Sequence, residues 1–322
     1  MSTDCDPNSS DTPRRVRCDR VILWVVAATW LWHVTLRDRW CPISMWIYMS
    51  PPEVLSVVLA GSLGWAAWRG ESKPWLAAGC VMLVLLGGLV GVRDWRFHST
   101  FEKSPQTSIR VGFWNLNRGV WASWDRMACA ARDFDADVLG FVEAVDELPQ
   151  TSEFWQARFP NHQVLTLGGG FVVLVRGQVT REGAGVLRGG GRFRRLKAEV
   201  NGQRFTLVLA DLPSDPWMSR ERPLRHLSEL LAAQTESPTL VVGDFNTPTF
   251  SVWFDELRSD WTNAFDFVGQ GYCPTWPMPL PVLTLDQMWG NRHIQFHRAE
   301  NHGSLLSDHR MVLAEFSVVK VQ

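Results

Sequence analysis

Acidic and amide residues recur where short apolar runs of the sequence end, throughout the later part of the chain. One histidine stands among them, in the run Ser307–Asp308–His309. Aspartate and asparagine are common at strand ends because both stabilise turns, so each residue alone says little. Together they supply carboxylates, amides and one imidazole. The residues are Asn115, Asn117, Glu143, Asp211, Asp244, Asn246, Asp286, Asp308 and His309.

These residue types suit one kind of chemistry if they meet in space. Carboxylate and amide oxygens are the ligands that Mg²⁺ or Mn²⁺ prefer, alongside water and substrate phosphate. An aspartate next to a histidine can orient the imidazole for proton transfer. A carboxylate can also activate a water molecule. Such a set is the equipment for metal-assisted hydrolysis of phosphoesters.

The pattern of apolar residues predicts how these side chains are positioned. From Ser108 the sequence has many short apolar or alternating runs, such as 109–114, 171–176 and 239–244, with few helical patterns between them. Alternation of apolar and polar residues is typical of a half-buried strand. Many strands with few interposed helices favour two packed sheets flanked by helices. The ends of such strands can converge on one rim, and we expect this α/β domain over 108–322.

Five motifs carry a resemblance to a known family. They are WNLN (Trp114–Asn117), DVLGFVEA (Asp137–Ala144), GDFNTP (Gly243–Pro248), TLDQM (Thr284–Met288) and SDHR (Ser307–Arg310). In order and spacing they resemble the motifs of the endonuclease/exonuclease/phosphatase superfamily. The resemblance implies a four-layered α/β sandwich, in which two packed mixed β-sheets are flanked by helices.

The same resemblance implies a metal site. Glu143 would be the principal ligand of Mg²⁺ or Mn²⁺, helped by Asn117 and Asp308. Asn115 would orient this cluster and the phosphate. Asn117 departs from the family pattern, because several relatives have aspartate there, and the lost charge would weaken metal binding unless Asp211 compensates.

Four further residues receive catalytic roles from the resemblance. Asp244 would position or deprotonate the attacking water. Asn246 would donate to a phosphate oxygen and stabilise charge as it develops. His309, paired with Asp286, would bind the phosphate or transfer a proton.

Asp211 stands where the family often has histidine or tyrosine. An aspartate can protonate a leaving oxygen only if burial or a like-charged neighbour raises its pKa. Alternatively, Asp211 is a further metal ligand, or the site needs no acid because a pyrophosphate leaving group is already acidic. Two more residues are predicted to bind substrate. Arg222 follows the Asp211 loop and Trp276 lies in a proline-rich loop, and their alternatives are an exposed helix position and simple packing.

Three apolar runs precede this domain and predict membrane helices. They are Val21–Leu36, Cys41–Trp68 and Trp75–Val92. A bilayer core needs about 20 apolar residues as helix. The sequence therefore predicts a three-helix membrane segment over 21–92, after a disordered cytoplasmic tail at 1–20 and before a linker at 93–107. A cleaved signal peptide at 1–40 is the competing interpretation, but no small-x-small cleavage site follows Leu36.

Basic residues predict the orientation of this segment. Arg14, Arg15, Arg17 and Arg20 precede the first run. Because basic flanks stay in the cytoplasm, the N-terminal tail is expected there. An odd number of spans then places the catalytic domain outside. We expect a multi-pass protein of the cell membrane with an extracytoplasmic catalytic domain.

Composition narrows the function classes. Lysine and arginine number 32 against 33 aspartate and glutamate, which gives a formal net charge of -1. Proteins that bind nucleic acid mainly by phosphate neutralisation are usually basic, so a general nucleic-acid coat protein is disfavoured. The cysteines form no CxxC pair, which disfavours zinc knuckles.

Membrane helices joined to this domain, with LPSDP (Leu212–Pro216) and TWP (Thr275–Pro277), resemble bacterial membrane phosphatases of the teicoplanin-resistance type. The resemblance implies a membrane-tethered, metal-dependent hydrolase of phosphoric esters or anhydrides. Its substrate would be a phosphorylated or pyrophosphorylated lipid, such as undecaprenyl pyrophosphate. The alternatives are an extracytoplasmic nuclease, which the mixed charge disfavours, a sphingomyelinase-like phosphodiesterase, and a non-catalytic binding pseudoenzyme. The sequence indicates no obligate protein partner.

Overall fold

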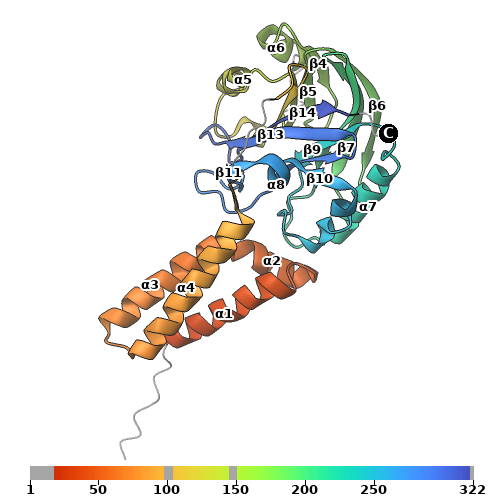
Figure 1. Ribbon diagram of the computed structural model, residues 1–322. Coiled ribbons are helices and arrows are strands. Elements are labelled where there is room, and N and C mark those ends of the chain that lie inside the picture. Colours follow the sequence, from red (N-terminus) through yellow and green to blue (C-terminus); the bar gives the residue numbers. More distant parts are fainter. Residues whose placement is uncertain (1–17, 98–103, 145–150, 320–322) are drawn as a thin grey trace, which may run out of the picture.

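The chain folds into two parts that lie end to end (Figure 1). The computed structural model describes residues 18–97, 104–144 and 151–319. Four helices form the first part, which we call the helical segment, and an α/β sandwich forms the second. The helices are α1 (Cys18–Thr35), α2 (Cys41–Met49), α3 (Pro52–Trp68) and α4 (Lys73–Arg93). Residues 1–17 of the predicted cytoplasmic tail lie outside the described residues.

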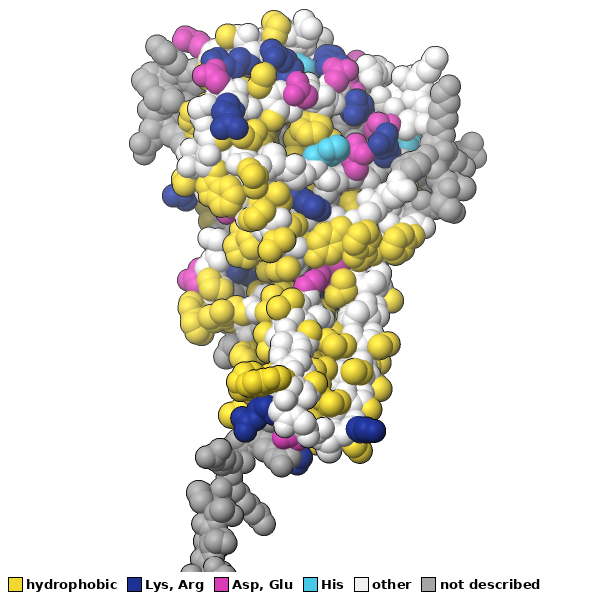
Figure 2. Space-filling model, turned by 90° about the vertical axis from the view of Figure 1, so that its left-hand side faces the viewer, with side chains coloured by type: hydrophobic (Ala, Val, Ile, Leu, Met, Phe, Trp, Pro, Cys, Tyr) yellow, Lys and Arg dark blue, Asp and Glu magenta, His cyan; other side chains and the backbone are white. Residues whose placement is uncertain are grey.

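The helical segment has a narrow apolar core and an apolar outer surface. Helices α2, α3 and α4 each have a proline in their first turn, where its missing N–H leaves no hydrogen bond unmade. Side chains on the outer surface such as Val57, Val84 and Val92 are 73%, 75% and 80% exposed. Figure 2 shows hydrophobic side chains over this segment and the adjoining base of the sandwich, while charged side chains gather over the far end. An exposed apolar surface of this kind marks contact with a membrane or a partner.

Helix lengths correct the prediction of three membrane-spanning helices. Among the described residues, α4 is long and apolar enough to cross a bilayer. The second run is broken before Pro52, and its two helices, Ile43–Met49 and Pro52–Trp68, meet at 67° and could form at most one bent span. The apolar part of α1, Arg20–Thr35, is shorter than the roughly 20 residues that a bilayer core requires. The structure thus supports one span, or two with the bent pair, so the number of spans no longer fixes the predicted extracytoplasmic orientation.

The sandwich consists of two six-stranded mixed sheets. The first sheet has the order β13 (Ile294–His302), β14 (Met311–Val318), β2 (Ile109–Asn115), β3 (Val138–Val142), β5 (Val172–Val175) and β4 (Gln163–Thr166). The second has the order β10 (Trp261–Asn263), β12 (Asp286–Asn291), β9 (Thr239–Asp244), β8 (Gln203–Asp211), β7 (Arg192–Val200) and β6 (Gln178–Val186). Each sheet contains one parallel pair, β2 with β3 and β8 with β9, and the other neighbours are antiparallel.

Helices cover the outer faces of both sheets. Helices α5 (Trp124–Asp133) and α6 (Thr151–Arg158) pack on the first sheet through Met127 and Trp155. Helix α7 (Glu221–Ala232) packs on the second sheet through Leu224, Leu227 and Leu231. A central core that includes Val111, Phe113, Leu207 and Val242 lies between the sheets. The two mixed sheets flanked by helices confirm the expected α/β architecture.

Short elements complete the fold. They are η1 (Asn117–Gly119), η2 (Val252–Phe254), η3 (Leu257–Ser259), α8 (Ala264–Val268), β1 (Trp95–Phe97) and β11 (Gln270–Tyr272). Strand β1, which lies within the predicted linker 93–107, pairs with β11 of the sandwich. The chain therefore leaves α4 directly into a strand that attaches the helical segment to the second part.

Candidate active site

Strand topology brings the polar strand ends to one rim. Parallel neighbours end at the same edge of a sheet, so Asn115 at the end of β2 lies beside Glu143, the first residue after β3. In the second sheet Asp211 and Asp244 face each other in register at the ends of β8 and β9. Asp286 begins β12, which runs antiparallel to β9, and it pairs in register with Asp244. The predicted convergence of strand ends is therefore present.

Gly243 allows this arrangement immediately before Asp244. A Cβ atom at Gly243 would lie 2.2 Å from the carbonyl oxygen of Ala210 on the neighbouring strand. No side chain fits in that space without separating β8 from β9. The glycine of the GDFN motif therefore keeps the Asp211 and Asp244 strand ends adjacent.

Four buried residues at the rim, which we call the inner cluster, are joined by short polar contacts. They are Asn115, Asp244, Asp286 and His309, each between 1% and 6% exposed. The amide nitrogen of Asn115 donates to Oδ2 of Asp244 at 2.9 Å. Nδ1 of His309 lies 2.8 Å from Oδ2 of Asp286, and Nε2 lies 3.9 Å from Oδ2 of Asp244. His309 thus stands between two carboxylates, paired with Asp286 as predicted.

The charges of the inner cluster are strongly coupled. Burial lowers the pKa of His309, but the carboxylates of Asp286 and Asp244 outweigh that effect and hold it well above its usual range. Burial raises the pKa of Asp244. The charge of His309 opposes this increase, and the charges of Asp286 and Asp211 add to it. A cationic imidazole between two buried acids can stabilise negative charge, and a carboxylate of raised basicity can accept a proton from water.

Asn246 is held against the Asp211 loop. Its backbone N–H donates to Oδ1 of Asp244 at 2.8 Å, and its side-chain amide donates to the carbonyl oxygen of Leu212 at 2.9 Å. Its φ is 45°, a left-handed conformation that asparagine tolerates better than most residues. These bonds fix Asn246 next to the inner cluster, and its donation to a phosphate oxygen stays a prediction.

The predicted metal ligands Glu143, Asn117 and Asp308, which we call the outer cluster, are more accessible. Glu143 accepts from the Asn115 amide at 3.3 Å and pairs with Arg118, whose Nε lies 3.3 Å from Oε2. The φ angles of Asn117, Arg118 and Glu143 are 43°, 52° and 51°. Three left-handed non-glycine residues at one site indicate that the fold holds these side chains in imposed positions.

The donor set of the outer cluster fits a hard divalent cation, because it offers two carboxylates and one amide oxygen. Among the described residues, Asp244, Asp286 and His309 also offer ligand atoms that lie within 4.8 Å of one another and could hold a metal ion. Glu143, Asn117 and Asp308 stay the predicted ligands.

Asp211 meets the condition for a proton donor. Burial raises its pKa to about 6, although Nη2 of Arg192 lies 3.1 Å from its Oδ2 and opposes this. The nearby charge of Glu143 adds to the increase. A carboxyl group with this pKa is partly protonated near neutral pH.

The two predicted substrate-binding residues lie in different settings. The ring centroid of Trp276 lies 6.5 Å from that of His309, and its indole N–H donates to Oδ2 of Asp308 at 3.2 Å. Trp276 therefore lines the site between the two clusters. Arg222 is exposed on α7, beside the turn at Gly189. Whether either residue touches substrate stays a prediction.

Sequence reasoning missed two hydroxyl residues that support the site. The Ser307 hydroxyl donates to the carbonyl oxygen of Asn115 at 2.7 Å and accepts from the backbone N–H of His309 at 3.2 Å. The Thr275 hydroxyl accepts from the backbone N–H groups of Leu285 and Asp286 at 3.0 and 3.1 Å. Their presence in the SDHR and TWP motifs was the available signal.

The helical segment also contacts the chain next to the site, through a residue that no sequence motif marks. Asp38, in the turn between α1 and α2, is 1% exposed. It accepts hydrogen bonds from the hydroxyls of Tyr48 and Ser251, both at 2.5 Å, and from the backbone N–H of Val252 at 2.9 Å. Ser251 and Val252 follow the GDFNTP loop. The helical segment therefore anchors the chain just after Asp244 and Asn246.

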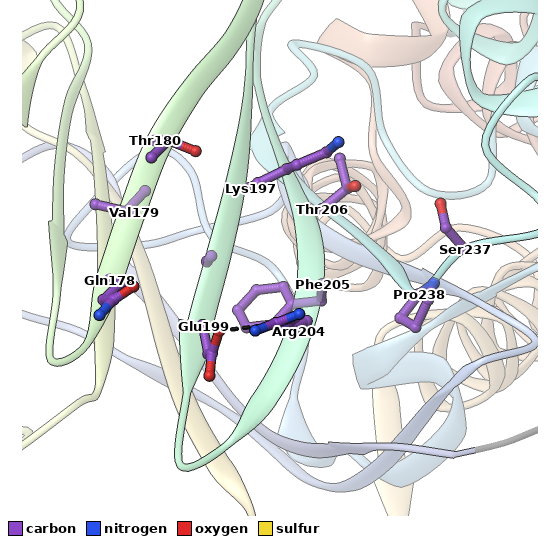
Figure 3. A pocket seen from close by; sticks show the side chains of 11 residues that line it. Gln178, Val179, Thr180, Lys197, Glu199, Arg204, Phe205, Thr206, Ser237 and Pro238 are labelled. Atoms are coloured by element: carbon purple, nitrogen blue, oxygen red, sulfur yellow. Dashed lines mark hydrogen bonds and ion pairs between the residues drawn. The ribbon is translucent and has the colours of Figure 1, made fainter.

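A cavity of about 470 Å³ lies elsewhere on the sandwich (Figure 3). Its side chains come from β6, β7, β8 and the loop at Ser237 and Pro238, and Figure 3 shows the ion pair between Glu199 and Arg204. Glu199 lies seven residues along β7 from Arg192, which pairs with Asp211 at the rim. At the usual rise per strand residue, this separates the two pairs by about 23 Å. This cavity is therefore separate from the candidate active site.

The sequence that forms this rim matches a known protein family. The model of the Endonuclease/Exonuclease/phosphatase family matches residues 112–309, more than half of the chain and all of both clusters. The chain belongs to this family. Members of the family hydrolyse phosphoester bonds and are typically dependent on divalent metals, which agrees with the chemistry of both clusters. The comparison with curated proteins found no match.

Solved structures show the same fold at low sequence identity. A family protein from Bacteroides vulgatus is 16% identical with a TM-score of 0.54, and the match covers 66% of this chain and 100% of that one. The human Nocturnin catalytic domain with a bound sulfate anion is 19% identical with a TM-score of 0.52, covering 67% and 97%. A mannosyl-6-phosphatase from Bacteroides thetaiotaomicron is 12% identical with a TM-score of 0.52, covering 65% and 99%.

Proposed function

We propose that this family member is a membrane-tethered, metal-dependent hydrolase of phosphoric esters or anhydrides, with a phosphorylated or pyrophosphorylated lipid as substrate. One observation carries the lipid part of the proposal. Ile47 and Tyr48 of α2 pack against Leu283 and Leu285, directly before the catalytic candidate Asp286. The rim therefore adjoins the apolar segment, where the headgroup of a membrane lipid would lie.

The apolar exterior of the helical segment supports the tether. Helix α4 has the length and hydropathy of a membrane span. The indoles of Trp40, directly before α2, and Trp46, within α2, are 51% and 52% exposed, as is typical of residues at a bilayer surface. Tethering raises the effective concentration of a membrane substrate at the site.

The residues of the two clusters divide the work of hydrolysis. Asp244 takes a proton from water as the water oxygen attacks phosphorus, and the bond from phosphorus to the leaving oxygen breaks. Protonated His309, held by Asp286, stabilises the charge on the phosphoryl oxygens. Asp211 donates a proton to a basic leaving oxygen. Glu143, Asn117 and Asp308 would hold Mg²⁺ or Mn²⁺, which supplies charge neutralisation at the phosphoryl oxygens when bound.

The test offers the purified full-length protein, in detergent with Mg²⁺, three substrates in parallel. These are undecaprenyl pyrophosphate, plasmid DNA and sphingomyelin. We expect phosphate release from the lipid pyrophosphate, abolished by Glu143→Ala and retained by the control Glu153→Ala, since Glu153 is an exposed residue of α6. Cleavage of DNA or sphingomyelin in preference to the lipid would contradict the proposed substrate. No turnover and no bound Mn²⁺ would instead indicate a binding pseudoenzyme.

A further inference from the structure

A buried arginine lies at the junction between the helical segment and the sandwich. Arg220, directly before α7, is 4% exposed. Its Nη1 donates to the carbonyl oxygen of Pro213, and its Nε is buried with no hydrogen-bond partner among the described residues. An unused donor on a buried cation is costly, so an anion that bonds to this guanidinium would stabilise it.

The helical segment is part of what buries this arginine. The thiol of Cys41 at the start of α2 donates to the carbonyl oxygen of Trp217 at 3.2 Å, so α2 lies against the loop that carries Arg220. Tyr48, also on α2, lies close enough to influence the pKa of the guanidinium. Burial lowers the pKa of Arg220, and Tyr48, Asp244 and Asp215 oppose that effect. An added anion would offset this desolvation.

The same loop is bonded to the catalytic residues. The backbone N–H of Leu212 donates to the carbonyl oxygen of Asp244 at 2.9 Å, and the carbonyl oxygen of Leu212 accepts from the Asn246 side chain at 2.9 Å. Pro213, the residue bonded to Arg220, is next in the chain. Arg220 is therefore linked through Pro213 and Leu212 to Asp244 and Asn246, and the carboxylate of Asp244 lies close enough to influence its charge.

We propose that Arg220 forms an anion subsite that binds a phosphate group of the substrate next to the one that is attacked. A guanidinium matches phosphate because its planar donors form two parallel hydrogen bonds to phosphate oxygens. In a pyrophosphate substrate this group is the second phosphate, which belongs to the leaving group when water attacks the first. The inference rests on the proposed function for the lipid source of the phosphate, but the subsite itself is tested without turnover.

The first experiment measures binding alone, with full-length protein in detergent and EDTA. Inorganic pyrophosphate is added, and the shift in unfolding temperature is recorded. We expect wild type to be stabilised, Arg220→Gln to lose most of the shift, and the control Arg225→Gln to keep it, since Arg225 is exposed on α7. An equal shift in Arg220→Gln would overturn the subsite.

The second experiment measures turnover of undecaprenyl pyrophosphate in vesicles. Arg220→Gln is expected to raise KM by about 10- to 100-fold, the effect of losing a charged hydrogen bond, with a smaller change in kcat. Arg220→Lys keeps the charge without the planar guanidinium, and its KM is expected to lie between those of wild type and Arg220→Gln. It replaces Arg220→Gln in the test if that variant does not fold. An unchanged KM in both variants contradicts the inference.

The two proposals fail in different ways. If wild type binds inorganic pyrophosphate through Arg220 but does not cleave the lipid, the proposed lipid substrate is wrong and the subsite takes free or other phosphate. If wild type cleaves the lipid and neither Arg220 variant changes binding or KM, the subsite is wrong and the proposed function stands.

Discussion

The inner and outer clusters differ in burial and in how their polar atoms are used. Asn115, Asp244, Asp286 and His309 are almost fully buried and bond to one another. Glu143 keeps 27% of its side chain exposed and is paired with Arg118, whose side chain is 74% exposed. The side-chain amide of Asn115 links the two clusters, because it donates to both Asp244 and Glu143.

This difference separates two tasks. Buried groups of the inner cluster hold fixed charges in fixed places, which is what stabilisation of a transition state requires. The outer cluster leaves oxygens accessible, and an exposed arginine such as Arg118 can move aside at low cost when a cation or phosphate arrives. Substitutions in the inner cluster should therefore affect kcat, and substitutions in the outer cluster should affect metal affinity.

The largest effect is expected for Asp244→Asn. This change keeps the shape of the side chain but removes the proton acceptor, so kcat should fall by about 10²- to 10⁴-fold. Mn²⁺ affinity, measured by electron paramagnetic resonance, should stay close to that of wild type. Exposed Asp260→Asn is the matched control. Loss of Mn²⁺ binding in Asp244→Asn would erase the distinction between the clusters.

Glu143→Gln should come next. Removing the charge of the principal ligand should weaken Mn²⁺ or Mg²⁺ binding by about 10- to 100-fold. Activity at low metal concentration should fall in parallel and recover as the metal concentration is raised, and EDTA should abolish it in wild type. If activity does not recover at saturating metal, Glu143 acts in the chemical step instead.

Asp38→Ala tests whether the helical segment helps to hold the inner cluster in place. The change leaves the Tyr48 and Ser251 hydroxyls and the Val252 N–H without their acceptor, and each unsatisfied buried donor costs about 1–3 kcal/mol. We expect a lower unfolding temperature and a kcat reduced by about 10-fold. Breaking the exposed Arg37–Asp255 pair with Asp255→Ala should change both little. If Asp38→Ala and Asp255→Ala had equal effects, the junction would attach the helical segment without supporting the inner cluster.

The smallest effect is expected at Asp211 and depends on the leaving group. As a proton donor with a pKa of about 6, Asp211 is protonated below that value, so hydrolysis of a lipid monophosphate should decrease as pH rises through it. Asp211→Asn should remove this limb and reduce that activity by about 10-fold. Pyrophosphate hydrolysis should show little change, because its leaving oxygen needs no acid. The same loss on both substrates would favour a metal-binding role for Asp211.

Local pattern was enough to predict much of the sandwich. Alternation at 109–114 and the apolar run at 239–244 gave β2 and β9, and the motifs placed Asn115 and Asp244 at their ends. The number of membrane helices was mispredicted because hydropathy counts apolar residues, whereas Pro51 and Pro52 end one helix and begin another at 67°. Strand β1 was missed because three residues inside a linker carry too little periodicity.

The sequence by itself determined which chemistry is available, because the motifs supply the carboxylates, amides and imidazole in a recognisable order. Only the tertiary structure decided how they are divided into a buried and an accessible cluster. It also placed Asp38 and Arg220 at the junction, 213 residues of sequence separating Asp38 from Ser251. Burial and charge coupling arise from contacts between distant segments, and no local pattern encodes them.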